Sequence, residues 1–204
     1  WAFAGVLNPA MSQLHAFVSE YSARDQPWRY LFQTTDVVMG TSLCLAGLAT
    51  LAWARHRPLG RQGWSGIGFV VGGLFSVLDA LVTMDCSPTR SPACMAAEEA
   101  GHVSASHIVH VGTSTVVVIG FALPILLLNS TMTRFRGFGL VVAWAWVIFT
   151  LLNGIGAMDW FNGTPMSYTG IWQRLSLGLG TLWWLTLAAD DVITARARNH
   201  VPSC

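Results

Sequence analysis

The sequence predicts an all-α fold, a polytopic bundle of transmembrane helices, and three observations lead to this prediction. Of the 204 residues, 53% are hydrophobic and only 10% are charged, too little polar surface for a water-soluble domain of this size. Five apolar stretches are long enough to cross a hydrocarbon core, which takes about 20 helical residues. The apolar runs are continuous rather than alternating, which favours helices over barrel strands. The predicted spans are 31–54, 64–84, 104–128, 138–158 and 170–190.

The residues before the first clear span do not complete another one. The chain opens on WAFAGVL without a Met, so we expect the numbering to begin inside a longer polypeptide, at the tail of an earlier span. The segment 8–30 is too polar to cross, and we expect it to form an interfacial helix on the outer surface followed by a turn at Gln26-Pro27. We therefore treat 1–204 as a single transmembrane domain with one surface segment at its start.

Small residues recur within the predicted spans and indicate where helices approach closely. The second span contains GIGFVVGG at 66–73, and the last contains GLG at 178–180. Without a side chain beyond hydrogen or methyl, such positions let neighbouring backbones come together. We interpret them as packing positions.

The basic residues indicate the orientation and exclude two kinds of chemistry. All eleven are arginine, so no lysine can form a Schiff base or hold a nucleotide phosphate, and the net charge of +1 gives no nucleic-acid footprint. Short cytoplasmic loops retain positive charge. One side of the predicted bundle carries seven arginines and the other carries four, so we predict a multi-pass membrane protein with the arginine-rich side in the cytoplasm and residues 85–103 outside. The seven are Arg55, Arg57, Arg61, Arg134, Arg136, Arg196 and Arg198.

Two cysteines lie together in that outer loop. Seven residues separate Cys86 from Cys94, and Pro88 and Pro92 are among them. An extracytoplasmic compartment allows a disulfide to persist, so we predict this bridge, with two free thiols or two metal ligands as the alternatives. The bridge would restrict the loop directly after Asp85.

Four ionisable residues fall at similar depth in the outer half of the predicted bundle. They are Asp36, Asp79, His107 and His110, on three different spans. An ionisable side chain inside a membrane is costly and therefore indicates a function. By helical phase, His107 and His110 share one face, which also carries Ser106 and Ser114, and the preceding span has a stripe of Ser76, Asp79 and Thr83. If these two faces meet, the polar groups converge in a pocket that opens outward.

Three interpretations of this pocket are open. In the first, zinc or another divalent metal is held by His107, His110 and one of Asp79 or Asp85, with His102 as a further candidate ligand and Glu20 or Asp36 handling the proton. In the second, Ser106, or else Ser104 or Ser114, is the nucleophile of a metal-free Ser/His/Asp site, although no Gly-x-Ser-x-Gly elbow is present. In the third, the polar groups satisfy one another and do no chemistry. Arg174, Arg29 or Arg24 is expected either to hold a phosphate or to be a solvated rim residue.

The segments NPAMSQLHAFVSEYSARDQPWRYLFQTTD, LDALVTMDCSPTRSPAC and SHIVH resemble a bacterial family called domain of unknown function 998. The resemblance covers most of the chain and implies a multi-helix membrane protein, but no activity. The matching positions are Ser19, Glu20, Asp36, Asp85, His107 and His110. The chain is also loosely similar to membrane hydrolases of the alkaline ceramidase and adiponectin-receptor type, in which Ser106 to His110 would match a Ser-x-x-x-His element. It departs from them because the last span contains no histidine.

Our leading functional prediction is a metal-assisted membrane hydrolase that cleaves an ester or amide of a lipid headgroup at the extracytoplasmic face. The alternative is a non-enzymatic sensor or accessory subunit that binds a lipid or protein partner through its outer loops. A haem-binding electron carrier is a third class, and the confinement of the intramembrane histidines to one span argues against it.

Overall fold

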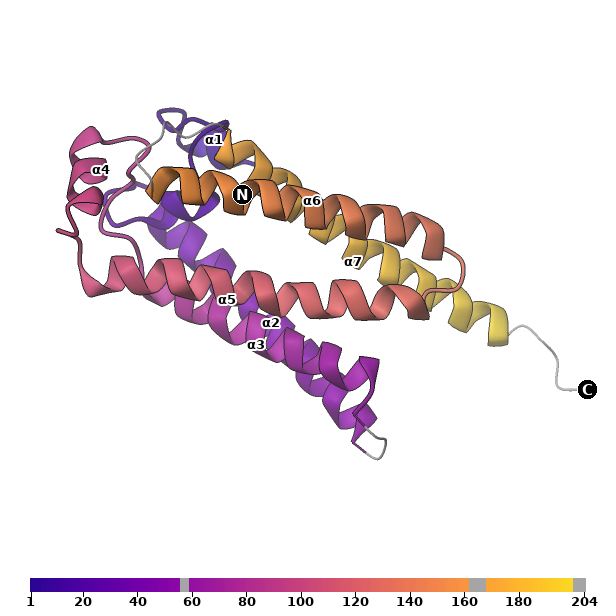
Figure 1. The fold of residues 1–204 in the computed structure, drawn as a ribbon. Helices are drawn as coiled ribbons and strands as arrows, with labels where there is room; N and C mark the ends of the chain where they lie inside the picture. Colours follow the sequence, from indigo (N-terminus) through magenta and orange to yellow (C-terminus); the bar gives the residue numbers. More distant parts are fainter. Residues whose placement is uncertain (56–58, 162–167, 200–204) are drawn as a thin grey trace, which may run out of the picture.

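The computed structural model describes residues 1–55, 59–161 and 168–199, and within them every regular element is a helix. The all-α prediction is confirmed (Figure 1). Of the arginines used above for orientation, Arg57 and the side chain of Arg198 lie outside the described residues. The elements in chain order are α1 (Ala4–Leu7), η1 (Val18–Ser22), α2 (Arg29–Ala54), α3 (Arg61–Leu81), α4 (Pro92–Glu99), α5 (Ala105–Leu128), η2 (Asn129–Thr131), α6 (Arg136–Phe161) and α7 (Thr169–Asn199).

Four of the helical segments are long and apolar enough to cross a membrane, so the chain is an integral membrane protein. They agree with four predicted spans to within about one helical turn and are Arg29–Ala54, Arg61–Leu81, Ala105–Thr131 and Arg136–Met158. The fifth predicted span, 170–190, is helical within α7, but α7 does not reach the same apolarity among the described residues. Gln173 and Arg174 lower the hydropathy of its first turns. The expected fragment of an earlier span is not confirmed either, because only the four-residue helix α1 forms there.

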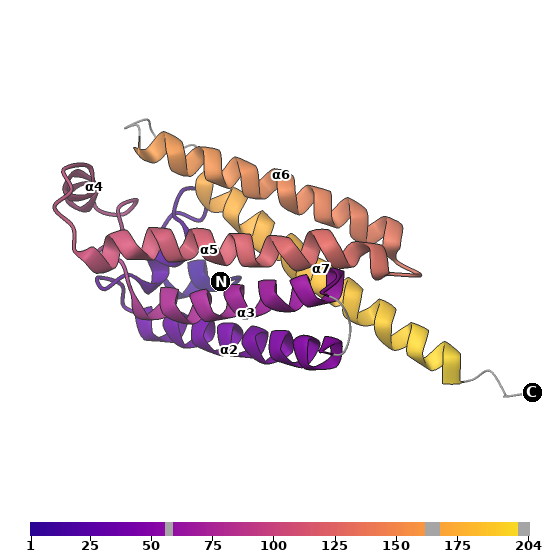
Figure 2. The ribbon, with the colours of Figure 1, turned by 60° about the horizontal axis from the view of Figure 1, so that its bottom comes forward.

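The long helices form two packed groups. Helix α3 packs between α2 and α5, and α6 packs along α7 (Figure 2). Glycine makes the closest approach possible: a Cβ atom added to Gly120 of α5 would lie 2.5 Å from the Cα atom of Gly72 of α3. Any larger residue there would collide with backbone, so the predicted packing role of the glycines in 66–73 is confirmed.

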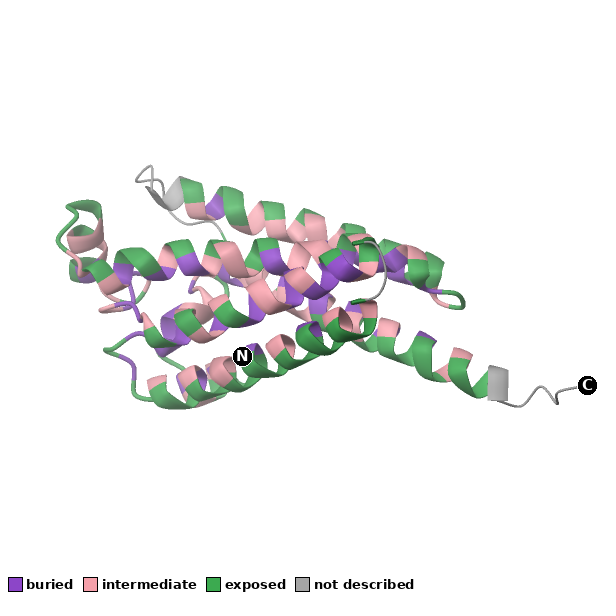
Figure 3. Cartoon of the chain, turned by 90° about the horizontal axis from the view of Figure 1, so that it is seen from below, coloured by how far each residue is buried: buried purple, intermediate pink, exposed green. Residues whose placement is uncertain are grey.

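The main hydrophobic core lies toward the end of the bundle at η2. Phe69 of α3, Ile125 of α5, Trp146 of α6 and Trp183 of α7 are buried there together. The opposite faces of the helices expose large apolar side chains, as expected for contact with lipid (Figure 3). We call this the η2 end, and we call the opposite end, where α4 and the first turn of α5 lie, the α4 end.

Asp190 of α7 fixes the start of α6 at the η2 end. Its carboxylate accepts the backbone N–H groups of Thr133, Arg134 and Phe135 at 2.8, 2.7 and 2.9 Å. These three residues immediately precede α6, so the carboxylate satisfies amides of the turn that leads into the helix. Asp190 therefore closes the turn between α5 and α6.

The N-terminal segment, residues 8–28, packs over the α4 end. The guanidinium of Arg174 donates from Nη1 to the carbonyls of Gln13 and Ala16, each at 2.9 Å. Asn8 donates to Gln26 at 2.8 Å, and both side chains are buried. The Arg174 side chain of α7 thus holds the segment in place through the backbone carbonyls of Gln13 and Ala16. The arrangement positions the loop between α3 and α5.

Candidate functional site

Asp79 and His110 meet at the interface of α3 and α5, as helical phase predicts. Ser114 Oγ donates to the two carboxylate oxygens of Asp79 at 3.0 and 3.1 Å, and Thr113 Oγ1 donates to Oδ1. His110 Nδ1 lies 3.2 Å from Asp79 Oδ1. We call Asp79, His110, Thr113 and Ser114 the Asp79 cluster. Its members bond to one another across the two helices through His110 Nδ1, whereas His110 Nε2 is buried without a hydrogen-bond partner.

The hydrogen bonds of His110 decide which ring nitrogen carries the proton. Nδ1 also lies 3.1 Å from the carbonyl oxygen of Asp79 and 2.9 Å from that of Val82. All three atoms facing Nδ1 are acceptors, so Nδ1 is the protonated nitrogen. The last carbonyls of α3 lack partners within the helix, and His110 supplies one. The ring therefore closes the end of α3.

Ser106, the predicted nucleophile, also donates to a backbone carbonyl near the end of α3. Its Oγ donates to the carbonyl oxygen of Thr83 at 2.9 Å, just beyond the end of α3. Ser104 is the N-cap residue of α5: its Oγ accepts the N–H of His107 at 3.3 Å. These bonds join the end of α3 to the start of α5. No described contact brings Ser106 against His107 or His110 in a triad.

Asp85 holds the start of α5 from the outside. Its carboxylate accepts the N–H and the hydroxyl of Ser104 at 2.6 and 2.7 Å, and the guanidinium of Arg24 at 2.9 Å. Burial alone would raise the pKa of Asp85, but the hydrogen bonds from Ser104 and the charge of Arg24 outweigh it and hold this pKa below its usual range. Asp85 is therefore an anion engaged in structure.

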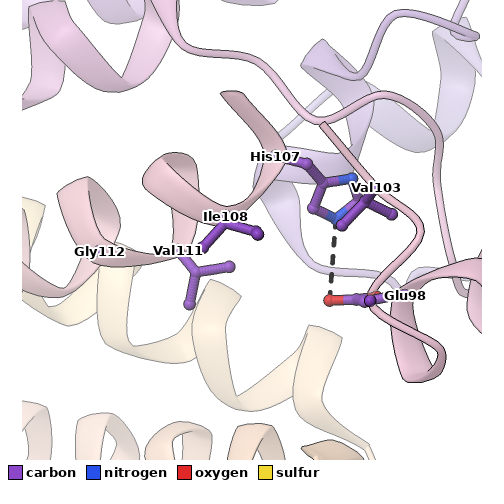
Figure 4. Close-up of a pocket in the computed structure, with 7 residues that line it drawn as sticks. Glu98, Val103, His107, Ile108, Val111 and Gly112 are labelled. Atoms are coloured by element: carbon purple, nitrogen blue, oxygen red, sulfur yellow. Dashed lines mark ion pairs between the residues drawn. The ribbon is translucent and has the colours of Figure 1, made fainter. Parts of the chain in front are cut away.

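His107 is buried, with 1% of its surface exposed, and it takes the opposite tautomer to His110. The backbone N–H of Asp85 donates to Nδ1 of His107 at 3.2 Å. Since Nδ1 accepts, the proton of the neutral ring is on Nε2. Nε2 lies 3.7 Å from Oε1 of Glu98, too far for a direct hydrogen bond (Figure 4).

A cavity of about 290 Å³ lies beside this pair. Its walls combine the carboxylate and the imidazole with aliphatic side chains, among them Ile108, which is 59% exposed (Figure 4). We call it the His107 cavity. Its lining residues are Glu98, Gly101, Val103, His107, Ile108, Val111 and Gly112.

The disulfide positions α4, and with it Glu98. Cys86 and Cys94 are bridged with their Cα atoms 6.0 Å apart, as predicted. Ser91 is the N-cap residue of α4, and its Oγ accepts the N–H of Cys94 at 3.3 Å. The bridge therefore joins the first turn of α4 to the residue that follows Asp85. Glu98 is not among the site residues predicted from the sequence; the disulfide, which anchors the helix carrying it, is the available signal.

Glu20 lies away from the cavity lining, in a clamp between the N-terminal segment and the loop after α3. It is fully buried and accepts the N–H of Phe17 at 2.9 Å, the N–H of Thr89 at 3.1 Å and the hydroxyls of Ser87 and Thr89. Burial raises the pKa of Glu20 above its usual range, although the hydrogen bonds act in the opposite direction. Its observed contacts are those of a structural acceptor.

The other predicted site residues are dispersed. Asp36 lies on α2, partly buried, and its charge interacts with that of Asp79 across the α2–α3 contact. His102 is exposed, and it does not line the cavity. Arg29 donates to the carbonyl of Arg24 at 3.0 Å, and Arg174 to carbonyls as described above. The arrangement leaves neither arginine directed at the cavity.

The residues present do not form a fitting set of zinc ligands. In the described part of the chain, no three His, Cys, Asp or Glu side chains lie close enough to hold an ion. His107 also has its proton on Nε2, so that nitrogen has no lone pair to offer, and its Nδ1 lone pair is occupied by the Asp85 amide. We therefore derive no chemistry through a metal.

Comparison with known proteins identifies a family. The family model described as protein of unknown function (DUF998) matches residues 1–190. No curated protein and no solved structure matches the chain, so the looser similarity to ceramidase-type and adiponectin-receptor-type hydrolases gains no support. The family match covers the N-terminal segment, the disulfide loop and nearly all of the described helices. The chain belongs to the DUF998 family of membrane proteins.

Proposed function

We propose that the protein binds an amphipathic molecule of the membrane in the His107 cavity, and that this cavity faces the extracytoplasmic side of a bacterial cytoplasmic membrane. The carrying observation is the composition of the cavity walls: the buried Nε2–H donor of His107 and the carboxylate of Glu98 share the lining with the aliphatic side chains of Val103, Ile108 and Val111. Polar groups that fix orientation within an otherwise apolar wall are typical of small-molecule sites.

The arginine distribution and the disulfide support this orientation. Among the described side chains, four arginines lie at the α4 end and five lie toward the η2 end, namely Arg55, Arg61, Arg134, Arg136 and Arg196. Short cytoplasmic loops retain positive charge. The Cys86–Cys94 bridge lies at the α4 end, where an oxidising compartment would preserve it.

We further propose that α7 is a fifth membrane crossing. Thr169 contacts Gly156 of α6 at the α4 end, and Asp190 caps the start of α6 at the η2 end. Helix α7 therefore runs beside α6 from one end of the bundle to the other, and α6 is itself apolar enough to cross.

Blocking the cavity tests the binding proposal. The probe is dodecanol with a diazirine on its chain, presented to the purified protein in phosphatidylcholine nanodiscs, with photolabelling mapped by mass spectrometry. We expect Ile108→Trp to lower labelling of residues 98–112 by about tenfold, relative to labelling of lipid-facing residues on α2. The matched control is Ile119→Trp, because Ile119 is 57% exposed on the same helix and does not line the cavity. Equal labelling in both variants would refute the proposal.

Hydrolysis of a lipid ester is a second candidate, favoured by the pairing of Glu98 with His107. Glu98 would take a proton from water as the oxygen attacks the ester carbonyl, and it would return that proton to the leaving alkoxide. His107 Nε2–H would donate to the oxyanion. It would not give up its proton, because Nδ1 accepts the Asp85 amide and offers no second proton.

Release of nitrophenolate from nitrophenyl dodecanoate tests this candidate. Glu98→Gln should abolish turnover, and Glu99→Gln, a change of the exposed neighbouring carboxylate, should leave it intact. Turnover that survives Glu98→Gln would remove Glu98 as the base, and absence of turnover in the unchanged protein would leave binding as the function.

A further inference from the structure

Three ionisable side chains lie at one level of the neighbouring helices α2, α3 and α5. Figure 2 shows α2 and α3 side by side and running in opposite directions, and a Cβ atom added to Gly40 of α2 would lie 3.0 Å from the Cβ atom of Ser76 of α3. Asp36 comes one turn before Gly40, and Asp79 comes one turn after Ser76, so the two carboxyl groups belong to adjoining turns. On the other side of α3, His110 Nδ1 of α5 lies 3.2 Å from Asp79 Oδ1.

Two carboxylates at this level would repel each other in apolar surroundings. The charge of Asp36 interacts with that of Asp79, and both residues belong to helices that are apolar enough to cross a membrane. Burial and a neighbouring like charge each disfavour the ionised form of a carboxyl group. When two carboxyl groups share such a site, one of them holds a proton.

Hydrogen bonds indicate which carboxyl group holds the proton. Asp79 accepts from Ser114 Oγ at 3.0 and 3.1 Å and from Thr113 Oγ1, and it faces the Nδ1–H of His110. Donors of this kind favour the ionised form of the group that accepts from them. In the described part of the chain, the carboxyl group of Asp36 accepts no hydrogen bond. Asp79 is therefore the anion of the pair, and Asp36 is the acid.

His110 provides a second position for a proton beside Asp79. Its ring is only 3% exposed, and Nε2 is buried without a hydrogen-bond partner. Because Nδ1 carries the proton of the neutral ring, Nε2 has a free lone pair. Protonation of Nε2 would place an imidazolium 3.2 Å from the Asp79 carboxylate, whose charge would stabilise it.

We propose that Asp36, Asp79 and His110 form a proton-binding site, in which Asp36 carries the proton near neutral pH, Asp79 stays anionic and His110 Nε2 accepts a second proton in acid. The proton would come from water at the α4 end, since Asp36 lies only about two turns from the start of α2. Two other charges act on the site. The amino group of Trp1 favours the ionised form of Asp36, and His107, one turn before His110, interacts with that ring.

Dicyclohexylcarbodiimide tests the proposal because it is apolar and modifies protonated carboxyl groups. The acid gives its proton to a carbodiimide nitrogen, its oxygen adds to the central carbon, and the adduct rearranges to a stable N-acylurea. Purified protein in phosphatidylcholine nanodiscs is treated at about pH 5, 7 and 9, and modification is mapped by mass spectrometry. We expect modification of Asp36 at about pH 7 to exceed that at about pH 9 by about tenfold. Asp36→Asn should remove it, and Glu99→Gln, a change of an exposed carboxylate, should keep it.

Two changes test the charges around Asp36. Asp79→Asn keeps the shape of the side chain and removes the anion, so it should lower modification of Asp36 at about pH 7 by about threefold. In protein shown to be folded by circular dichroism, unchanged modification would mean that Asp79 acts only through packing, and it would overturn the shared site. Acetylation of the amino terminus is selective among amines because the chain contains no lysine, and it should raise modification of Asp36.

The remaining outcomes decide where the proton lies. Modification of Asp36 at about pH 5 but not at about pH 7 would show a reachable, ionised group and would overturn the proposal. Modification of Asp79 instead of Asp36 would overturn the assignment. If no carboxyl group reacts, infrared difference spectra decide: a protonated-carboxyl band near neutral pH that Asp36→Asn removes supports the proposal, and its absence overturns it. In nitrogen NMR spectra, His110 Nε2 should be unprotonated near neutral pH; a protonated Nε2 would place the proton on the ring. Asp36, Asp79 and His110 do not line the His107 cavity, so these results are independent of ligand binding there.

Discussion

His107 and His110 lie one turn apart on α5, yet they belong to two different kinds of region. His110 donates to carbonyls at the end of α3 and takes part in the Asp79 cluster. His107 accepts from the Asp85 amide and turns its proton toward the His107 cavity. The Asp79 cluster joins two helices, whereas all the described lining residues of the cavity belong to the stretch from Glu98 to Gly112. A polar group inside a membrane protein can therefore hold the fold or face a ligand, and its hydrogen-bond partners distinguish the two.

The largest expected effect comes from removing the carboxylate of the Asp79 cluster, which tests whether this cluster stabilises the fold. Asp79→Ala leaves Ser114 and the His110 N–H without their carboxylate acceptor, and we expect a loss of about 3 kcal/mol in stability. The measurement is thermal unfolding followed by helical circular dichroism. Glu98→Gln is the control and should leave the transition unchanged. A folded, equally stable Asp79→Ala protein would show that the cluster is not structural.

A smaller loss of stability is expected from removing Glu20, whose carboxylate holds the N-terminal segment against the loop before α4. Glu20→Ala removes the acceptor for Phe17, Ser87 and Thr89, and we expect a destabilisation of about 2 kcal/mol. Labelling of residues 98–112 in protein that remains folded should persist. Loss of labelling at unchanged stability would instead return Glu20 to the candidate site.

The disulfide should affect the cavity and leave the Asp79 cluster intact. In Cys86→Ser/Cys94→Ser, α4 loses its covalent link to the end of α3, so cleavage after Glu98 and Glu99 by a glutamate-specific protease should rise by about tenfold. Cys44→Ser is the matched control, because Cys44 is not in a disulfide. Unchanged cleavage would mean that α4 is held by contacts other than the bridge.

The smallest expected effect concerns pH and Asp85, whose backbone N–H donates to His107. Its pKa is lowered in the folded protein, so its contribution to stability is present above the pKa of the unfolded chain, about 3.9, and is lost as the pH falls through the folded value. Wild type should therefore be more stable than Asp85→Asn at pH 7, and the difference should shrink as the pH is lowered toward 3. A constant difference would contradict the assignment.

Much of the fold and part of the site follow from sequence alone. Continuous apolar runs locate four spans, and helical phase correctly brings Asp79 to His110 and Ser114. The contacts that join distant loops leave no periodic signal, which is why Glu20 with Thr89 and Arg174 with Gln13 were not predicted. The different roles of His107 and His110 also depend on the hydrogen-bond partner of each ring. Spacing places both on one face and does not distinguish them.

The contacts of α7 have a consequence for how the protein is made. Domains synthesised on the ribosome begin to fold from their amino end. The amides of Thr133, Arg134 and Phe135 nevertheless gain their acceptor only when Asp190 has been synthesised. In the same way, the carbonyls of Gln13 and Ala16 gain their donor only with Arg174. Helix α7 is synthesised after the other described helices, and it completes both the turn before α6 and the anchoring of the N-terminal segment. Both ends of the described bundle therefore depend on one step, the docking of α7.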